Sequence, residues 1–304
     1  MKNVINYYYN LYPDNIRQEN RDFNFIYLDD NYYFIPYNRP IEEVIPLFEL
    51  NKEMINKGLL VHEIITNKDK HILTNIDKQS YIMLRVYINA KLKTSIVDIN
   101  YFNNMVGLNY KQILNKSDWV KLWSDKIDYI EYQINQIGKK YSLICESISY
   151  FIGLSENAIS YIKNVDIDLN VKKLNNLIVS HRRISINDTL FDTYNPLNFV
   201  IDYRIRDLSE YIKSHIFVGK NIWFDIDHYF KRNNLSVLEY RLLFGRLLFP
   251  SFYFDIYDKV IKEEIPEQEI ITVVNRINYY EDFLREFYDY IKIKANIPEV
   301  EWLR

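Results

Sequence analysis

Apolar and polar positions divide the chain into an N-terminal part with strand spacing and a longer part with helical spacing. Residues 29–31 separate the first two strand-like runs and give a hairpin signal. From Ile41, apolar residues recur at helical spacing until Gly58, a typical helix stop. The predicted order is two strands, one helix and three strands. The strand-like runs cover residues 22–28, 31–37, 62–66, 72–76 and 81–88.

Beyond about Asn89, helical periodicity takes over. Apolar residues from Trp119 to Ile137 recur every three or four positions, which predicts an amphipathic helix. Gly153 is predicted to end a helix, and Pro266 is predicted to lie in the first turn of another. Between the helices, residues 177–200 are typical of short strands or loops. The further predicted helices cover residues 141–151, 155–163, 208–216, 236–249, 251–264 and 266–294.

Length and composition bound the fold. With 304 residues, 48% of them apolar, the chain can form two domains or one large bilobed fold. A formal net charge of −3 gives no electrostatic argument for nucleic acid or for an anionic membrane. The longest apolar runs are too short for a membrane span, so none is expected. The N-terminus lacks signal-peptide features, and synthesis in the cytoplasm is expected.

Metal and phosphate chemistry find little support in residue usage. Cys145 is the single cysteine, and the five histidines have no H-x-x-x-H spacing, so no thiolate or histidine metal site is predicted. The chain has 6 glycines and no glycine-rich turn of the kind that holds phosphates on backbone N–H groups.

Two segments of the helical part carry a family resemblance. SHRRISIND (180–188), followed by FVIDYRIRDLSEYI (199–212), resembles the catalytic loop and metal-binding segment of the aminoglycoside phosphotransferase and choline kinase superfamily. The pattern there is H-G-D-x-x-x-x-N, then I-D-[FW], then Asp-Leu opening a helix. More narrowly, FIGLSENAISYI (151–162) and IPEVEWL (297–303) resemble the YutH branch of the CotS-like spore coat proteins.

The resemblance implies an α+β, bilobed, protein-kinase-like fold. Its small mixed-sheet N-lobe with one helix would span residues 1–89, and its larger, mainly helical C-lobe residues 90–304. It also implies a place in the spore coat and partners among other spore coat proteins.

The catalytic positions of the superfamily are altered. Arg183 occupies the slot of the catalytic aspartate two residues after His181, and Asp188 that of the metal-binding asparagine. A guanidinium cannot accept a proton from a substrate hydroxyl, so no catalytic residue is expected. Asp202 alone keeps metal-binding chemistry, to be shared with Asp188 if the site is active.

The phosphate-holding positions are altered as well. The carboxylates of the turn at residues 29–31 would repel a triphosphate, and the run 31–37 has no lysine for the strand slot. Glu49 or Glu53 could fill the slot of the lysine's partner, but without the lysine either is more simply a solvated helix residue.

Each remaining residue has a structural interpretation. Arg183 would bridge its loop to a carboxylate such as Asp202 or Asp207, in preference to recognising an anion. His181 would orient the loop by packing and hydrogen bonding. Asp207 would cap the helix that follows it.

The sequence therefore favours a non-catalytic kinase-fold protein, a pseudokinase, with a structural or assembly role in the bacterial spore coat and no cofactor. One alternative is an active phosphotransferase of the aminoglycoside or choline kinase type with an atypical residue set, which would use ATP and Mg²⁺. A second is a scaffold that binds a nucleotide without turnover. Nucleic acid is not an expected partner.

Overall fold

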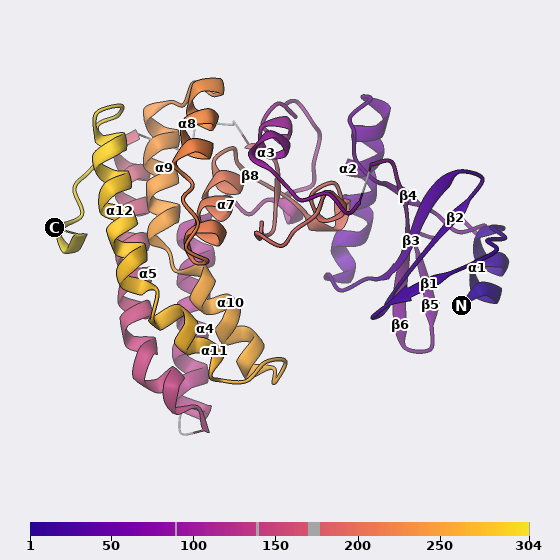
Figure 1. Cartoon of the computed structure of the whole chain (residues 1–304), viewed down its shortest axis with the longest axis horizontal. Helices are drawn as coiled ribbons and strands as arrows, with labels where there is room; N and C mark the ends of the chain where they lie inside the picture. The colour runs from indigo at the N-terminus through magenta and orange to yellow at the C-terminus, as the bar shows by residue number, and fades with distance from the viewer. Residues whose placement is uncertain (89, 138–139, 170–176, 304) are drawn as a thin grey trace. The chain divides into compact units, whose positions relative to one another are not determined.

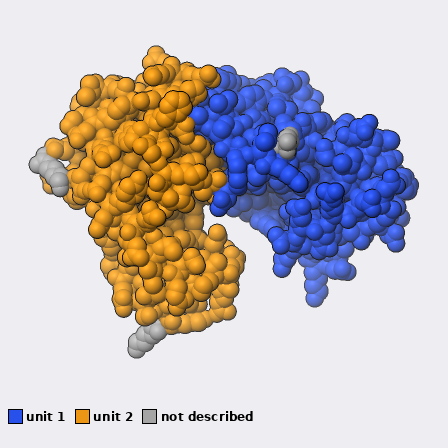
Figure 2. Space-filling view, in the orientation of Figure 1, with its two compact units in different colours: residues 1–115, 178–182, 187–201 blue, residues 116–177, 183–186, 202–304 orange. Residues whose placement is uncertain are grey.

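The computed structural model describes residues 1–88, 90–137, 140–169 and 177–303, which divide into two compact units. Figure 2 colours unit 1 (1–115, 178–182 and 187–201) blue and unit 2 (116–177, 183–186 and 202–304) orange. This division differs from the expected boundary at residue 89. Segments far along the chain join unit 1 through bonds such as His62 N–H to the Tyr194 carbonyl, 2.9 Å.

Antiparallel strands form the sheet of unit 1, in the order β1-β2-β3-β6-β4 with β5 also paired to β6 (Figure 1). The five predicted strands are present, and the mixed α+β class is confirmed. The short strand β1 and the helix α1 (Lys2–Tyr9) are not among the predicted elements. All three β1 residues are exposed, so this strand has no apolar alternation to predict it from. The strands are β1 (Arg17–Glu19), β2 (Asp22–Tyr27), β3 (Asp30–Pro36), β4 (Glu63–Ile65), β5 (Leu73–Ile76) and β6 (Gln79–Val86).

The β2–β3 hairpin turns earlier than the sequence predicts. Leu28 and Asp29 are the two turn residues, and both have positive φ, 49° and 66°. Two successive positive φ angles match the right-handed twist of the flanking strands. Asp30 already belongs to β3 and forms an ion pair with Arg85 of β6 at 2.5 Å.

Both faces of this sheet are apolar. On one face, Ile5 and Tyr9 of α1 belong to the same buried cluster as Phe34 of β3. On the other, Ile35 of β3 lies in a cluster with Val44 of α2 (Val44–Asn56), which follows the 3-10 turn η1 (Ile41–Glu43). Successive strand side chains point to opposite faces, so β3 contributes to two separate cores.

The central hairpin segment contains short elements. β7 and β8 form a two-stranded sheet, and the strand character expected for 177–200 is present at both ends of that range. The elements of this segment and of its approach are α3 (Ile96–Phe102), η2 (Gln112–Leu114), β7 (Leu177–His181), α6 (Leu190–Thr193), η5 (Pro196–Asn198) and β8 (Phe199–Tyr203).

Helices make up unit 2, as predicted, but two predicted boundaries are wrong. Gly153 lies inside one continuous helix, and Ser155 donates to the Phe151 carbonyl at 2.7 Å instead of capping a new helix. The range 266–294 splits in two, and Pro266 precedes the first of them. The helices are α4 (Trp119–Ile137), α5 (Ser142–Leu169), α7 (Arg206–Ile216), α8 (Trp223–Arg232), α9 (Val237–Leu248), α10 (Ser251–Ile261), α11 (Glu269–Val274) and α12 (Ile277–Lys292), with a last turn η6 (Glu301–Leu303). Within the described ranges, no helix is both long and apolar enough to cross a bilayer.

Candidate functional site

Asp202 is the residue around which the candidate site of unit 2 is organised. It lies in β8, and none of its surface is exposed. Both carboxylate oxygens accept from the indole Nε1 of Trp119 at 3.0 Å, and Oδ1 also accepts from the Tyr203 amide at 2.7 Å. A buried carboxylate needs such donors and a counter-charge to offset its desolvation.

The counter-charge of Asp202 is the guanidinium of Arg206. The two residues lie four positions apart, where β8 passes into α7, and Arg206 donates directly to Oδ2. Arg206 is itself only 6% exposed. The sequence predicts a carboxylate such as Asp202 or Asp207 as the partner of Arg183. In the structure, Asp202 pairs with Arg206 instead.

Glu210, one turn further along α7, forms a second buried centre. Arg246 of α9 donates to its Oε1 at 3.0 and 3.2 Å. Lys213 Nζ lies 3.8 Å from the same oxygen, and Arg183 Nε lies 3.7 Å from Oε2. The guanidinium of Arg246 also lies over the Trp119 ring at 4.7 Å, which links this centre to that of Asp202.

Arg183 closes the exposed side of this arrangement. It forms a bidentate bond with Asp255 of α10, Nε to Oδ2 at 2.7 Å and a second nitrogen to Oδ1 at 3.0 Å. Its side chain is 45% exposed. We call the whole group the ionic cluster; its members are Trp119, Arg183, Asp202, Arg206, Glu210, Lys213, Arg246 and Asp255.

The electrostatics of the cluster favour a charged Glu210. Burial alone would raise the pKa of its carboxyl, but the surrounding cations, Arg183 first and then Lys213, hold it far below its usual range. Burial lowers the pKa of Lys213 to about 7; Arg246 adds to this effect and Glu210 opposes it. Lys213 also donates to the Phe249 carbonyl and to Ser251 Oγ, each at 3.1 Å.

The other predicted site residues lie in different surroundings. Asp207 is buried within the first turn of α7, which begins at Arg206 with Ile205 at the cap position, so the prediction that Asp207 caps this helix is wrong. His181 is buried in unit 1, where its Nε2 pairs with the Thr193 carbonyl at 2.7 Å. Asp188 also belongs to unit 1, and its carbonyl accepts from the Thr94 amide at 3.1 Å.

An aromatic stack covers the α2 face of the sheet in unit 1. Phe191, three residues after Asp188, stacks on Tyr33 of β3 with ring centroids 4.4 Å apart. It also stacks on the buried His62, with ring centroids 5.5 Å apart. Nothing in the spacing of the sequence indicates this three-ring stack, because its members come from three distant segments.

Carboxylates of β1 and of the first residue of β2 act on Tyr33 of this stack. Burial, Glu19 and Asp192 raise the pKa of Asp22. Burial followed by Glu19 and Asp22 likewise raises the pKa of the Tyr33 phenol. No residue of β3 is a lysine. In the described residues, no three or more His, Cys, Asp and Glu side chains gather in a way that could hold a metal ion.

The two glutamates considered as partners of a strand lysine face a loop. Glu53 accepts from the Asn109 amide at 2.9 Å and pairs with Lys57 at the same distance. Glu49 pairs with Lys111 at 3.5 Å. Both therefore fasten the segment after α3 to the helix α2.

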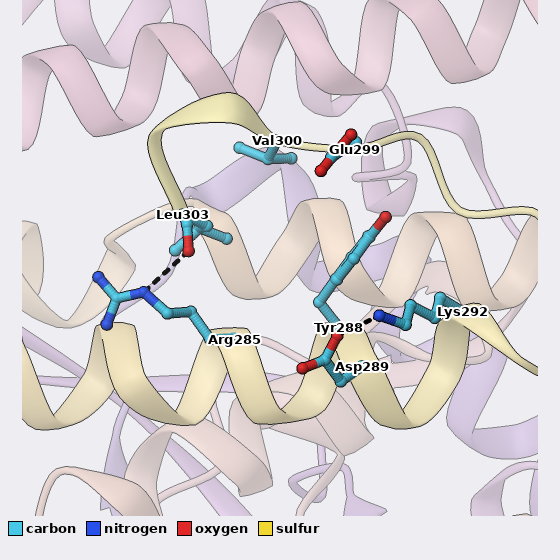
Figure 3. A pocket seen from close by; sticks show the side chains of 7 residues that line it. All are labelled: Arg285, Tyr288, Asp289, Lys292, Glu299, Val300 and Leu303. Carbon is cyan, nitrogen blue, oxygen red and sulfur yellow. Dashed lines mark hydrogen bonds and ion pairs between the residues drawn. The ribbon is translucent and has the colours of Figure 1, made fainter.

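A cavity of about 300 Å³ lies between α12 and the C-terminal segment (Figure 3). Arg285 spans it and donates to the Leu303 carbonyl at 2.8 Å. The basic groups that line it have acidic partners on α12: Glu281 and Asp282 for Arg285, and Asp289 for Lys292. The geometry serves to hold the segment in place and does not concentrate charge of one sign.

The fold is that of the aminoglycoside phosphotransferase-like kinases. An aminoglycoside phosphotransferase from Alicyclobacillus acidocaldarius matches 93% of this chain and 94% of its own with a TM-score of 0.69 and 9% identity. A spectinomycin phosphotransferase solved with ADP and spectinomycin matches 92% of both chains with a TM-score of 0.56 and 10% identity. At such identities the likeness concerns the fold alone.

The chain belongs to the family described as spore coat putative kinase YutH, whose family model matches residues 2–287. A relative in this family is the endospore coat-associated protein YutH of Bacillus subtilis, 28% identical over 212 residues. That match covers 61% of this chain, and the chain spans about three fifths of the relative's length (61%).

Replacement of Asp202 tests whether the ionic cluster is structural. In Asp202→Ala, Arg206 becomes a buried charge without its carboxylate, and the free energy of unfolding should fall by about 3 to 5 kcal/mol in urea denaturation. Asp202→Asn, which keeps an acceptor for Trp119, should lose less. The exposed Asp125→Ala is the matched control and should stay within about 0.5 kcal/mol. An Asp202→Ala protein as stable as the parent would contradict a structural role.

Lys213 should make the stability depend on pH. Its folded pKa of about 7 lies below the usual 10.5, so between these values the unfolded chain binds more protons and stability rises with pH. Below pH 7 the buried Lys213 is charged and lowers the free energy of unfolding by its full amount. As Lys213 loses its proton, the free energy of unfolding should rise by about 3 kcal/mol by pH 9. Urea titrations from pH 6 to 9 should show this rise, and Lys213→Met should flatten it. An equal slope in both proteins would refute the assignment.

Proposed function

We propose that this chain is a non-catalytic member of the kinase fold, a pseudokinase, which acts as a structural or assembly component of the spore coat. The observation that carries the proposal is the state of Asp202. Phosphoryl transfer in this fold needs acidic and amide oxygens free to hold Mg²⁺ against the nucleotide phosphates. The Asp202 oxygens are engaged by Trp119, the Tyr203 amide and Arg206.

The geometry of the other phosphate positions supports the same proposal. In active kinases a lysine of the third strand and the residues of the catalytic loop hold opposite ends of one nucleotide–metal complex. In this chain Tyr33 of that strand stacks directly on Phe191, which follows the loop by three residues in the sequence. The group of carboxylates around Asp22 adds like-charge repulsion toward a triphosphate. These residues do not fit ATP and Mg²⁺, so no cofactor is proposed.

The loop lacks a base at the catalytic position. Arg183 stands in the slot of the catalytic aspartate, and Glu210 and Asp255 hold the pKa of its guanidinium above the ordinary value, although partial burial acts the other way. A permanently charged donor cannot take a proton from a substrate hydroxyl. The active alternative would also need Asp202 to hold a metal ion together with Asp188, but both Asp202 oxygens already accept from Trp119 and one is paired with Arg206.

Thermal unfolding with and without millimolar ATP or GTP and Mg²⁺ tests the loss of nucleotide binding. A ligand that binds the native state stabilises it by about 2.7 kcal/mol at a hundredfold excess over its Kd, so an unchanged midpoint is the expected result. A Mg²⁺-dependent rise that disappears in Asp202→Asn, but persists in Asp125→Asn, would overturn the proposal. It would favour the active enzyme or the nucleotide-binding scaffold, which a phosphotransfer assay then separates.

The coat role rests on family membership and on the coat-associated relative. Its partners would then be other spore coat proteins. A fluorescent fusion of the chain, expressed in sporulating Bacillus subtilis, should gather in a shell around the forespore. A signal that stays uniform in the mother cell throughout sporulation would contradict the coat role while leaving the proposal of an inactive site intact.

A further inference from the structure

A shallow apolar groove lies between α5 and α11 of unit 2. Its volume is about 290 Å³, and its walls are two helices that pack against each other. Apolar side chains dominate the lining: Leu143, Tyr150 and Phe151 from α5, and Ile270, Ile271 and Val274 from α11.

The helix α11 carries apolar side chains on its exposed side as well as on its buried side. α11 has only six residues, of which Ile270 and Val273 point inward and are buried. Ile271 and Val274 point outward and are 40% and 38% exposed. A surface helix normally carries polar residues on that side, so this pair is an unpartnered apolar face.

Acidic residues outnumber basic ones in the segments that carry the groove. Residues 140–156 and 262–285, which include its lining, contain eight acidic and four basic side chains, in a chain whose formal net charge is only −3. Glu146 lines the groove itself, and Glu269 begins α11. Two of the four basic groups are already paired, Lys140 with Glu263 at 2.5 Å and Arg285 with Glu281 and Asp282. The field at this site therefore favours a positively charged partner.

We propose that this groove docks a basic amphipathic helix of a partner protein. Apolar side chains three and four positions apart would fill the space between Phe151 and Ile271, and flanking lysines or arginines would face the carboxylates. The wall from Leu143 to Phe151 is about 12 Å long, which matches two turns of a docked helix. The proposal extends the structural or assembly role proposed above and rests on that role for the existence of a partner. It does not depend on whether the chain binds nucleotide.

Calorimetric titration of the full chain with synthetic peptides of about 15 residues tests the groove. The probe carries leucines at helical spacing and lysines on the other face. One matched peptide has glutamate for lysine, and another has the same composition in an order that destroys the apolar stripe. The lysine peptide should bind at least about tenfold more tightly than either.

Substitutions in the groove separate docking from general attraction between charges. Ile271→Asp should weaken the lysine peptide by about tenfold or more because it removes apolar contact, although it adds a negative charge. Ile293→Asp, at a side chain 85% exposed outside the groove, is the control and should change the affinity little. Equal or tighter binding by Ile271→Asp would show non-specific electrostatic attraction and overturn the proposal, as would absence of binding by the lysine peptide.

The single cysteine gives an independent measure of position. Cys145 is exposed on α5, next to Glu146 of the groove, and it can carry an environment-sensitive dye. Its emission should shift with the lysine peptide and stay unchanged with the glutamate peptide. Because these titrations contain no nucleotide, their failure would leave the proposal of an inactive kinase fold untouched, and a nucleotide-induced shift would leave the groove untouched.

Discussion

Neutralisation of one buried carboxylate organises unit 2. Asp202 has no contact with water, so its charge is tolerable only because Arg206 and the Trp119 indole surround it. That requirement places α7 against the start of α4, since Arg206 and Trp119 lie on these two helices. The Trp119 ring also contacts the guanidinium of Arg246 in α9, and Arg246 pairs with Glu210.

The same carboxylate can serve two different chemistries, depending on its counter-ion. Mg²⁺ requires near-octahedral oxygen ligands and keeps several waters, so a metal-holding aspartate must remain open to solvent and to phosphate. A guanidinium on the neighbouring helix turn supplies a positive charge from within the chain. The kinase fold of the family is therefore compatible with an Asp202 that stabilises the helical unit, and fold alone does not imply phosphoryl transfer.

Unit 1 has a comparable arrangement built from rings instead of charges. Phe191 lies between Tyr33 and His62 and joins the hairpin segment to the sheet. Arg39 adds buried bonds to the Leu197 and Phe199 carbonyls at 2.7 and 2.8 Å. The part of the hairpin segment from residue 187 to residue 201 is thus packed as part of unit 1. Burial of His62 lowers its pKa to about 4, consistent with a neutral ring in that core.

The sequence by itself determined the local features: the strands of unit 1, the helical periodicity of unit 2, Arg183 in the aspartate slot and the absence of a lysine from β3. These are readable because spacing and residue type act within a few positions. Only the tertiary structure decided the partners. Trp119 and Asp202 are 83 positions apart, and Arg183 and Asp255 are 72 apart. Likewise, α5 runs on through Gly153 because packing against neighbouring helices outweighs the weak preference of one glycine to end a helix.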